Sequence, residues 1–381
     1  MSYPSVEKLQ QTLAKDVFHY AKDKKKAAGR ALGTLVELFT YYTLRAWQFR
    51  DNIVIERPLP EFANPDITHN VEFTLHPSLA SEDFCVPAFK LPLTGRKLHA
   101  MSGVAPFYAE LERDMVSGTL LASNGTRRNS AIIATADNTL LVANVLDHNT
   151  SATTIRIAKL HKNPFAAFEC KRVGVEEGMK KGPQTIEKAK QGAYVARTVS
   201  SLQKIRARDG KAHGYLEKSD GTILTGPLAE VAETIIASSD KDLLKDFILT
   251  VGVVSNHGNW FTAENQNKEL RVLAQSYDWL LFLTDAGLTQ FIDKLLLKPV
   301  PELRAARDAF LRSYNTEKKG NCFTKVQIDN EADAALVCYF KDHEAEIESW
   351  YNVISPRGET LDKLQAELNA LAQKNWTEIH R

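Results

Sequence analysis

The segment NPFAAFECKRVGVEEGMKKGPQTIEKAKQGAYVA, residues 163–196, decides how the whole chain is interpreted. It begins with an apolar run that predicts a buried strand, and it then places Glu169 and Lys171 two residues apart. Side chains two residues apart on a strand project from the same face of a sheet. We therefore expect Glu169 and Lys171 to lie together, while Phe168 and Cys170 face the opposite way.

A carboxylate beside an ammonium group at the end of a buried strand suits metal-dependent hydrolysis. Carboxylate oxygens are the ligands that Mg²⁺ takes in proteins. A lysine orients the attacking water and stabilises charge on a phosphate. The competing interpretation is an ion pair at a strand end, which contributes little to stability. The apolar residues before Glu169 argue against it, because they favour a central strand.

Such a site needs a second carboxylate, and the sequence offers three. Asp147 lies at the start of the hairpin whose second strand is expected to carry Glu169, so the two carboxylates would meet at one end of the sheet. Asp66 belongs to a Pro-Asp dipeptide, and it takes the role instead if residues 80–130 are an insertion. Asp137 is the third candidate. The geometry of a hairpin favours Asp147, and the choice stays open.

Composition is that of an ordinary globular protein. The chain has 381 residues, of which 44% are hydrophobic and 25% charged, as expected for one large or two modest domains. Its formal net charge is +1, so binding to nucleic acid needs a local basic patch. We see no signal peptide and no apolar run of membrane-spanning length. Four scattered cysteines without a CxxC pair indicate reduced thiols in the cytoplasm.

Hydrophobic periodicity predicts helices and strands in alternation. The expected helices cover residues 5–49, 183–208 and 227–246. The expected strands cover short pieces of 52–77, then 139–146, 153–160, 165–173 and 247–256, with a strand followed by a helix in 278–297 and a short strand pair at 322–329 and 335–340. The pattern is irregular and rich in turn residues from about 80 to 130.

This order favours a mixed β-sheet flanked by helices, in the α/β or α+β class. We expect residues 1–298 to form the core, with an inserted region at about 80–130. Residues 299–381 are expected to be mainly helical and to serve in dimerisation or DNA contact.

The combination of a Pro-Asp dipeptide with Glu169-Cys170-Lys171 resembles the PD-(D/E)xK nuclease superfamily, which includes type II restriction endonucleases. Residues 33–37, GTLVE, resemble the GxxxE helix of many members, in which the glutamate, here Glu37, contacts a metal ion or its water. Residues 191–194, QGAY, resemble a glutamine–tyrosine pair of the exonuclease-like branch, with the spacing one residue off. The resemblance spans about residues 27–290.

This resemblance implies a restriction-endonuclease-like core and Mg²⁺-dependent hydrolysis of DNA phosphodiester bonds. Glu169 would hold the metal ion with Asp147 or Asp66, Glu37 would contact it, and Lys171 would lie beside the attacking water.

Candidates for DNA contact lie in three loops. Lysines beside the site would track phosphates, arginine pairs with guanine in the major groove, and loops that follow buried strands hold ligands in α/β proteins. The residues are Lys180, Lys181 and Gln184 after the catalytic strand, Arg127 and Arg128 in SNGTRRNS, and His257 in SNHGNW. A structural histidine is an equally good interpretation of His257.

These features together favour a type II restriction endonuclease that cuts double-stranded DNA at a specific sequence. A palindromic site implies a homodimer, and restriction implies a cognate DNA methyltransferase as functional partner. One alternative is a repair or recombination nuclease of the same fold that acts on structured or single-stranded DNA. Another is a catalytically inactive DNA-binding protein. The phosphate-loop pattern GxxxxGK[ST] is absent, so no ATP-driven motor is indicated.

Overall fold

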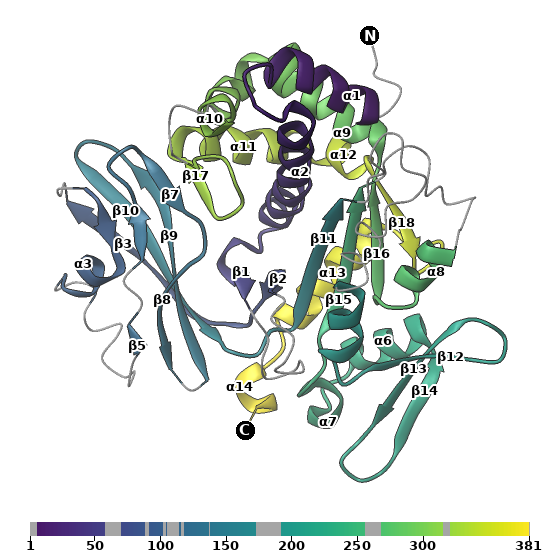
Figure 1. Cartoon of the computed structure of the whole chain (residues 1–381). Coiled ribbons are helices and arrows are strands. Elements are labelled where there is room, and N and C mark those ends of the chain that lie inside the picture. Colours follow the sequence, from purple (N-terminus) through teal and green to yellow (C-terminus); the bar gives the residue numbers. More distant parts are fainter. Residues whose placement is uncertain are drawn as a thin grey trace.

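The computed structural model describes residues 6–57, 70–87, 91–101, 104, 114–115, 118–136, 138–172, 192–255, 268–314 and 321–380. Helices cover both faces of a central mixed sheet, and a second sheet stands to one side of it (Figure 1). The expected class, a mixed sheet flanked by helices, is confirmed. In these ranges no helix combines the length and the apolar character needed to cross a bilayer.

The central sheet of the described residues has six strands. Their order across the sheet is β1 (Ile53–Arg57), β2 (Val71–Leu75), β11 (Ala166–Arg172), β15 (Leu249–Ser255), β16 (Trp279–Leu283) and β18 (Tyr351–Ser355). The third, fourth and fifth strands of this order, β11, β15 and β16, run parallel to one another. The remaining neighbouring pairs are antiparallel. Every residue of β15 and β16 is buried. Parallel strands covered on both faces require such continuous apolar runs, which is why the sequence predicted these two strands correctly.

One face of this sheet packs on α2 (Lys24–Ala46) and α13 (Leu361–Ala372). The α2 helix starts where the side chain of Asp23 accepts a hydrogen bond from the backbone N–H of Lys26. Leu35 and Phe39 of α2 join Phe168 of β11 in the main core. The opposite face packs on the helix over residues 192–198 and on α8 (Lys268–Ala274).

A second, antiparallel sheet is inserted in the chain between β2 and β11. Among the described residues its order is β3 (Ser78–Pro87), β10 (Ala152–His161), β9 (Thr139–His148), β8 (Ala131–Ala136) and β5 (Asp114–Met115). It stands on the left in Figure 1. The inserted unit therefore runs from about residue 78 to 161, well beyond the expected 80–130. The stretch expected to be irregular includes most of the ten-residue strand β3.

The predicted hairpin between residues 153–160 and 165–173 is wrong. β10 pairs with β9 and β3, whereas β11 pairs with β2 and β15 in the other sheet. The chain changes sheets at Phe165, whose backbone N–H donates to Leu75 O at 2.8 Å. The physical reason is that residues on both faces of β11 are buried: Phe168 packs toward α2, and Ala167 packs against Val195 and Val199. Such a strand needs cover on both sides, which only the central sheet provides.

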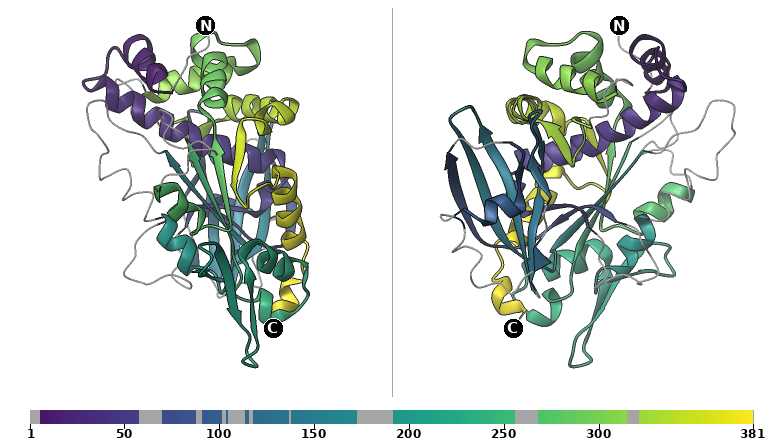
Figure 2. Two further views of the ribbon diagram at one scale, coloured as in Figure 1. Left: turned by 90° about the vertical axis from the view of Figure 1, so that its right-hand side faces the viewer. Right: turned by 60° about the vertical axis from the view of Figure 1, so that its left-hand side comes forward.

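Two smaller sheets complete the β structure of the described ranges. One contains β12 (Gln203–Arg206), β13 (Ala212–Glu217) and β14 (Ile223–Pro227), and the other contains β17 (Gln327–Asp329), β7 (Thr126–Arg128), β6 (Thr119–Leu121) and β4 (Leu93–Thr94). The hairpin of β13 and β14 projects from the lower end of the molecule in Figures 1 and 2. The helix predicted over 183–208 is therefore wrong at residues 203–206, and the strand predicted at 335–340 lies inside a helix, α11 (Asn330–Asp342).

The other helices pack around these sheets. They are α1 (Val6–Thr12), η1 (Leu13–Val17), η2 (Arg50–Asn52), α3 (Gly95–His99), α6 (Leu228–Ala237), α7 (Lys241–Leu244), α9 (Asp285–Ile292), η3 (Asp293–Leu297), η4 (Pro301–Leu303), α10 (Arg304–Tyr314), α12 (Glu344–Glu348) and α14 (Trp376–Ile379). The single helix expected over 227–246 is divided into α6 and α7.

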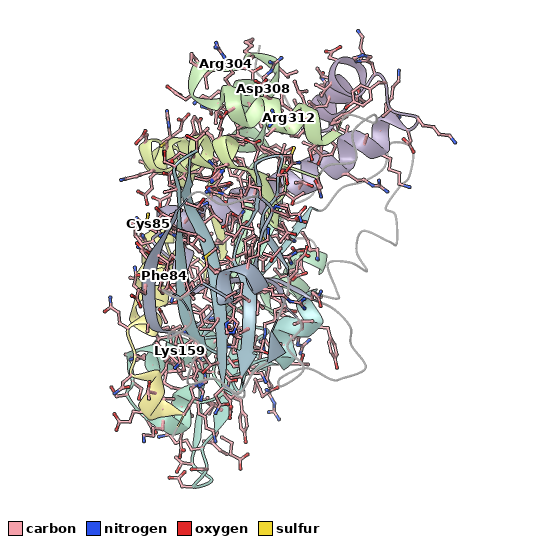
Figure 3. The ribbon with its side chains drawn as sticks, turned by 90° about the vertical axis from the view of Figure 1, so that its left-hand side faces the viewer. Phe84, Cys85, Lys159, Arg304, Asp308 and Arg312 are labelled. Atoms are coloured by element: carbon pink, nitrogen blue, oxygen red, sulfur yellow. The ribbon has the colours of Figure 1, made fainter. Side chains whose placement is uncertain are left out.

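The chain after residue 298 belongs to the same core as the rest. β18 pairs with β16 in the central sheet, and Leu336, Leu364 and Leu368 join the cluster that contains Phe168. The outer side of α10 is open on the surface. Figure 3 shows Arg304, Asp308 and Arg312 there, at the top of the view, and Cys85 lower down on β3.

A buried ionic network joins the second sheet to the helices. Asp333 of α11, 1% exposed, accepts hydrogen bonds from Tyr42 Oη at 2.7 Å and Arg45 Nη1 at 2.5 Å, both on α2. It also pairs with the guanidinium of Arg127 on β7, which donates to Val145 O at 3.0 Å. Burial lowers the pKa of Arg127 to about 10. One carboxylate thus pairs with two cations that come from different layers of the fold.

Replacing this carboxylate will be costly because two guanidinium groups stay buried without it. We expect Asp333→Ala to lower the free energy of unfolding by about 3–5 kcal/mol. The control Asp83→Ala removes the partially exposed ion pair of Asp83 with Arg156, 2.5 Å apart, and should cost less than about 1 kcal/mol. Urea unfolding of the two variants measures the difference, and equal losses would contradict this account of the network.

The C-terminal helix α14 is attached through stacked histidines. The rings of His161 and His380 lie 4.2 Å apart at an interplanar angle of 9°. Burial lowers the pKa of His380 to about 4 and that of the neighbouring His76 to about 3. Both groups are therefore held neutral in the folded protein.

Acid should weaken the fold through these histidines. A histidine whose pKa falls on folding takes up its proton first in the unfolded chain, so the stability it supports is complete above its ordinary pKa of 6.5. That stability is lost as the pH falls from 6.5 toward about 4 for His380. We expect the variant His380→Phe, which keeps an aromatic ring against His161, to lose less stability over this range than the parent protein. His19→Gln, at an exposed site, should follow the parent, as measured by urea unfolding at several pH values.

Candidate active site

Glu169 and Lys171 lie side by side on β11, as the two-residue spacing predicted. Lys171 Nζ is 2.5 Å from Glu169 Oε1, and Glu169 is only 5% exposed. Their register partners on β15 are Gly252 and Val254. The pair therefore belongs to the central sheet and is not an ion pair on an exposed strand.

A second carboxylate comes from β2, the neighbouring strand. Lys171 Nζ is 3.6 Å from Glu72 Oε1, and the Glu72 side chain is 13% exposed. The residues around Glu72 are VEFTL, and Val71 and Phe73 on either side of it are buried. A glutamate inside a short apolar strand was the available signal for this residue, and sequence reasoning missed it.

A second lysine, Lys325, binds three carboxylates from three elements. Its Nζ lies 3.2 Å from Glu37 Oε2 on α2 and 3.1 Å from Glu56 Oε1 on β1, and it also pairs with Glu72 Oε2 on β2. The Lys325 side chain is 4% exposed. We call Glu37, Glu56, Glu72, Glu169, Lys171 and Lys325 together the carboxylate cluster.

The carboxylate cluster is negative overall. Its four carboxylates and two ammonium groups leave a formal charge of −2 when all are ionised. Burial raises the pKa of Glu37, and the ammonium of Lys325 opposes that rise. A buried site with surplus negative charge attracts cations.

Glu56 reaches Lys325 from an unusual backbone conformation. Its φ is +52°, in the left-handed region that non-glycine residues rarely adopt. On either side of Glu56, Ile55 lies opposite Phe73 and Arg57 lies opposite Val71 in the pairing of β1 with β2. Such strain persists only where surrounding contacts hold it, and it is often found at functional sites.

The far side of Glu169 is packed without free space. A Cβ at Gly192 would lie 2.6 Å from Glu169 Cγ and 2.8 Å from Tyr277 Oη. A Cβ at Gly252 would lie 2.8 Å from the ring of Tyr277. Burial, with the charge of Glu169 nearby, raises the pKa of Tyr277 far above its usual value. The two glycines therefore let the 192–198 helix and Tyr277 fix the position of Glu169.

The structure assembles some of the predicted site residues and separates others. Glu37, Glu169 and Lys171 come together. Asp147 does not join them, because it lies exposed on β9 of the second sheet, opposite Thr154.

The two arginines predicted to contact DNA have different surroundings. Arg127 is buried against Asp333 and has no surface to offer DNA, so this prediction is wrong for the structure described. Arg128 is exposed on β7 and stays a candidate. The predicted site residues that lie outside the described ranges are Asp66, Asp137, Lys180, Lys181, Gln184 and His257.

The residue types fit a hard divalent cation, although lysines separate the carboxylates. Carboxylate oxygens are the ligands that Mg²⁺ prefers, and the formal charge of the carboxylate cluster favours a cation. In the described part of the chain, no three His, Cys, Asp or Glu side chains converge as a metal-binding group. Lys325 lies among Glu37, Glu56 and Glu72, and Lys171 lies between Glu72 and Glu169.

Comparisons with known proteins add no assignment. No protein-family model matches the sequence, no curated protein matches it, and no solved structure matches the fold.

The close packing at Gly192 predicts a position-specific effect of an added methyl group. We expect Gly192→Ala to lower the free energy of unfolding by about 1–3 kcal/mol, as overpacking does in tight interiors. Gly33 of the GTLVE segment is the matched control, since a Cβ there has no neighbour within 4 Å. Gly33→Ala should raise stability by about 0.5–1 kcal/mol because Gly33 lies inside a helix. Urea unfolding distinguishes the two substitutions, and a neutral Gly192→Ala would contradict the packing around Glu169.

Proposed function

We propose that the protein is a metal-dependent nuclease that hydrolyses phosphodiester bonds in double-stranded DNA, as a type II restriction endonuclease. One observation carries this proposal: Glu72, Glu169 and Lys171 lie together on the adjacent strands β2 and β11. Two carboxylates in this arrangement can hold a metal ion, and the lysine can orient a water and stabilise charge on a phosphate.

The order of elements around the site also supports the proposal. Helix α2 with Glu37 precedes the antiparallel strands β1 and β2, and β11 with Glu169 lies between β2 and the parallel strand β15. The helix over 192–198 follows β11 in the chain. This order of elements supports the proposal because it matches what the resemblance of the sequence motifs to PD-(D/E)xK nucleases implies. The second sheet is then an insertion before the strand that carries Glu169.

Each residue of the site has a chemical role in this proposal. Glu72 and Glu169 would hold Mg²⁺, with Asp66 as a further ligand from the Pro-Asp dipeptide. The bound ion would act as a Lewis acid on the phosphate and lower the pKa of a bound water. Lys171 would orient the attacking water and stabilise the charge that develops on the phosphate. Glu37 would accept a hydrogen bond from a water molecule beside the metal ion.

Sequence specificity and symmetry are part of the same proposal. A homodimer would present two sites to the two strands of a palindromic sequence, and a cognate methyltransferase would protect the host's own DNA in the cytoplasm. The inserted residues 78–161 add a large surface to the nuclease core, and Arg128 is exposed on β7 within this insertion. On the outer side of α10, Arg304 and Arg312 lie on a surface that a DNA backbone or a second subunit can contact (Figure 3).

The direct test is cleavage of unmethylated phage DNA by the purified protein, with Mg²⁺ and with EDTA. We expect discrete fragments with Mg²⁺ only. Glu169→Gln and Lys171→Ala should each lower the rate by at least about 10²-fold, because the first removes a ligand of the metal ion and the second removes positive charge that acts on the reacting phosphate. Lys218→Ala, which removes a surface ion pair with Asp240 at 2.6 Å, should cleave like the parent protein.

Two further variants distinguish the aspartates, and the products distinguish the functions. Asp66→Asn should abolish cleavage, whereas Asp147→Asn should retain it because Asp147 lies in the other sheet. Progressive degradation without discrete fragments would indicate a repair or recombination nuclease instead. DNA binding without cleavage by the folded parent protein would contradict the nuclease proposal and favour an inactive DNA-binding protein.

A further inference from the structure

Lys325 is held in the carboxylate cluster by its backbone as well as by its side chain. Its carbonyl oxygen accepts a hydrogen bond from Asn129 Nδ2 at 3.0 Å, and Val326 O accepts from the backbone N–H of Asn129 at 2.9 Å. The next residues form β17, which pairs with β7. Lys325 is therefore fixed to the edge of the β7 sheet and is not carried by a free loop.

The ammonium group of Lys325 matches its surroundings in number and in charge. An ammonium has three N–H donors, and three carboxylates, Glu37, Glu56 and Glu72, lie within ion-pair distance. Its Nζ also lies 5.9 Å from the centre of the Phe73 ring, a cation–π arrangement. A hydrated Mg²⁺ keeps several waters in its octahedral shell, and a position that is 4% exposed has little access to them.

We propose that Lys325 is a positioning residue that acts as a built-in cation of the active site. It takes the place that a second divalent ion would otherwise occupy among Glu37, Glu56 and Glu72, and it leaves Glu72 and Glu169 to a single metal ion. The part concerning that single metal ion rests on the proposed nuclease function. The part concerning Lys325 does not, because it follows from the charges in the carboxylate cluster.

The charge balance explains why such a cation is needed. Without Lys325 the formal charge of the carboxylate cluster would change from −2 to −3. Glu37 and Glu56 would lose the ammonium that they share, and Glu72 would keep only Lys171. Like charges repel, and either a divalent ion or the uptake of a proton by one carboxylate relieves this repulsion. A variant without the lysine should therefore recruit a metal ion in its place.

The experiment measures Mn²⁺ binding by isothermal titration calorimetry, together with the melting temperature in EDTA and in Mn²⁺, with no DNA present. We expect the parent protein to bind one Mn²⁺ ion. Lys325→Met keeps the length of the side chain and removes its charge, so this variant should bind two Mn²⁺ ions. It should melt at a lower temperature than the parent in EDTA, and Mn²⁺ should restore much of the loss.

The matched control is Lys204→Met. Lys204 is also a buried lysine, paired with Asp278 at 3.3 Å, but it lies on β12 outside the carboxylate cluster. Its replacement should destabilise the protein without adding a Mn²⁺ site and without rescue by Mn²⁺. Rescue confined to Lys325→Met separates a cation role from a merely structural one.

Each outcome decides between the two proposals. Unchanged Mn²⁺ stoichiometry in folded Lys325→Met, with no rescue by Mn²⁺, would overturn the role of Lys325. A parent that binds no Mn²⁺ beside a Lys325→Met variant that binds one would support Lys325 as the built-in cation and count against the nuclease function. If Lys325→Met does not fold in Mn²⁺, the role of Lys325 is tested with the double variant Lys325→Met/Glu37→Gln. This variant restores the formal charge of the carboxylate cluster to −2. A folded double variant with one Mn²⁺ supports the proposal, and an unfolded one overturns it.

Discussion

The pairing of four carboxylates with two lysines, Lys171 and Lys325, is the constraint on which the rest of the structure depends. Ionised groups leave water only when opposite charges and hydrogen bonds replace the lost hydration. Glu37, Glu56, Glu72 and Glu169 come from four different elements, so α2, β1, β2 and β11 must all be in place before their charges are paired. Lys325 adds the segment before β17, and with it the sheet that contains β17 and β7, to the same requirement.

The surrounding architecture serves to hold this cluster. β11 is covered on both faces, so Glu169 and Lys171 project from a strand with little freedom to move. On one side the glycines at 192 and 252 allow Tyr277 and a helix to come close to Glu169. Away from the cluster, Asp333 joins α11, α2 and β7 through Tyr42, Arg45 and Arg127. Both sets of charges thus bind the sheet that contains β17 and β7 to the core, which keeps Lys325 aligned with its three partners.

The sequence predicts what depends on local pattern and misses what depends on distant pairing. The buried strands β15 and β16 and the relation of Glu169 to Lys171 follow from apolar runs and from the two-residue period of a strand. Glu72 and Lys325 were missed because their partners are far away in the chain. The choice of Asp147 failed because adjacent strand-like runs were taken for a hairpin, although β11 pairs with β2 across the whole insertion. The strands β12–β14 had a local signal that was overlooked: the Asp-Gly turns at Gly210 and Gly221, with φ of +79° and +81°.

The central claim is that these residues form a site for one divalent cation beside a fixed lysine. The most direct measurement is anomalous diffraction from crystals of the protein soaked in Mn²⁺. The account predicts a single Mn²⁺ peak in contact with Glu72 and Glu169, with the ammonium of Lys325 still paired with Glu37 and Glu56. A peak that displaces Lys325 from these carboxylates, or the absence of any peak at Glu169, would contradict it.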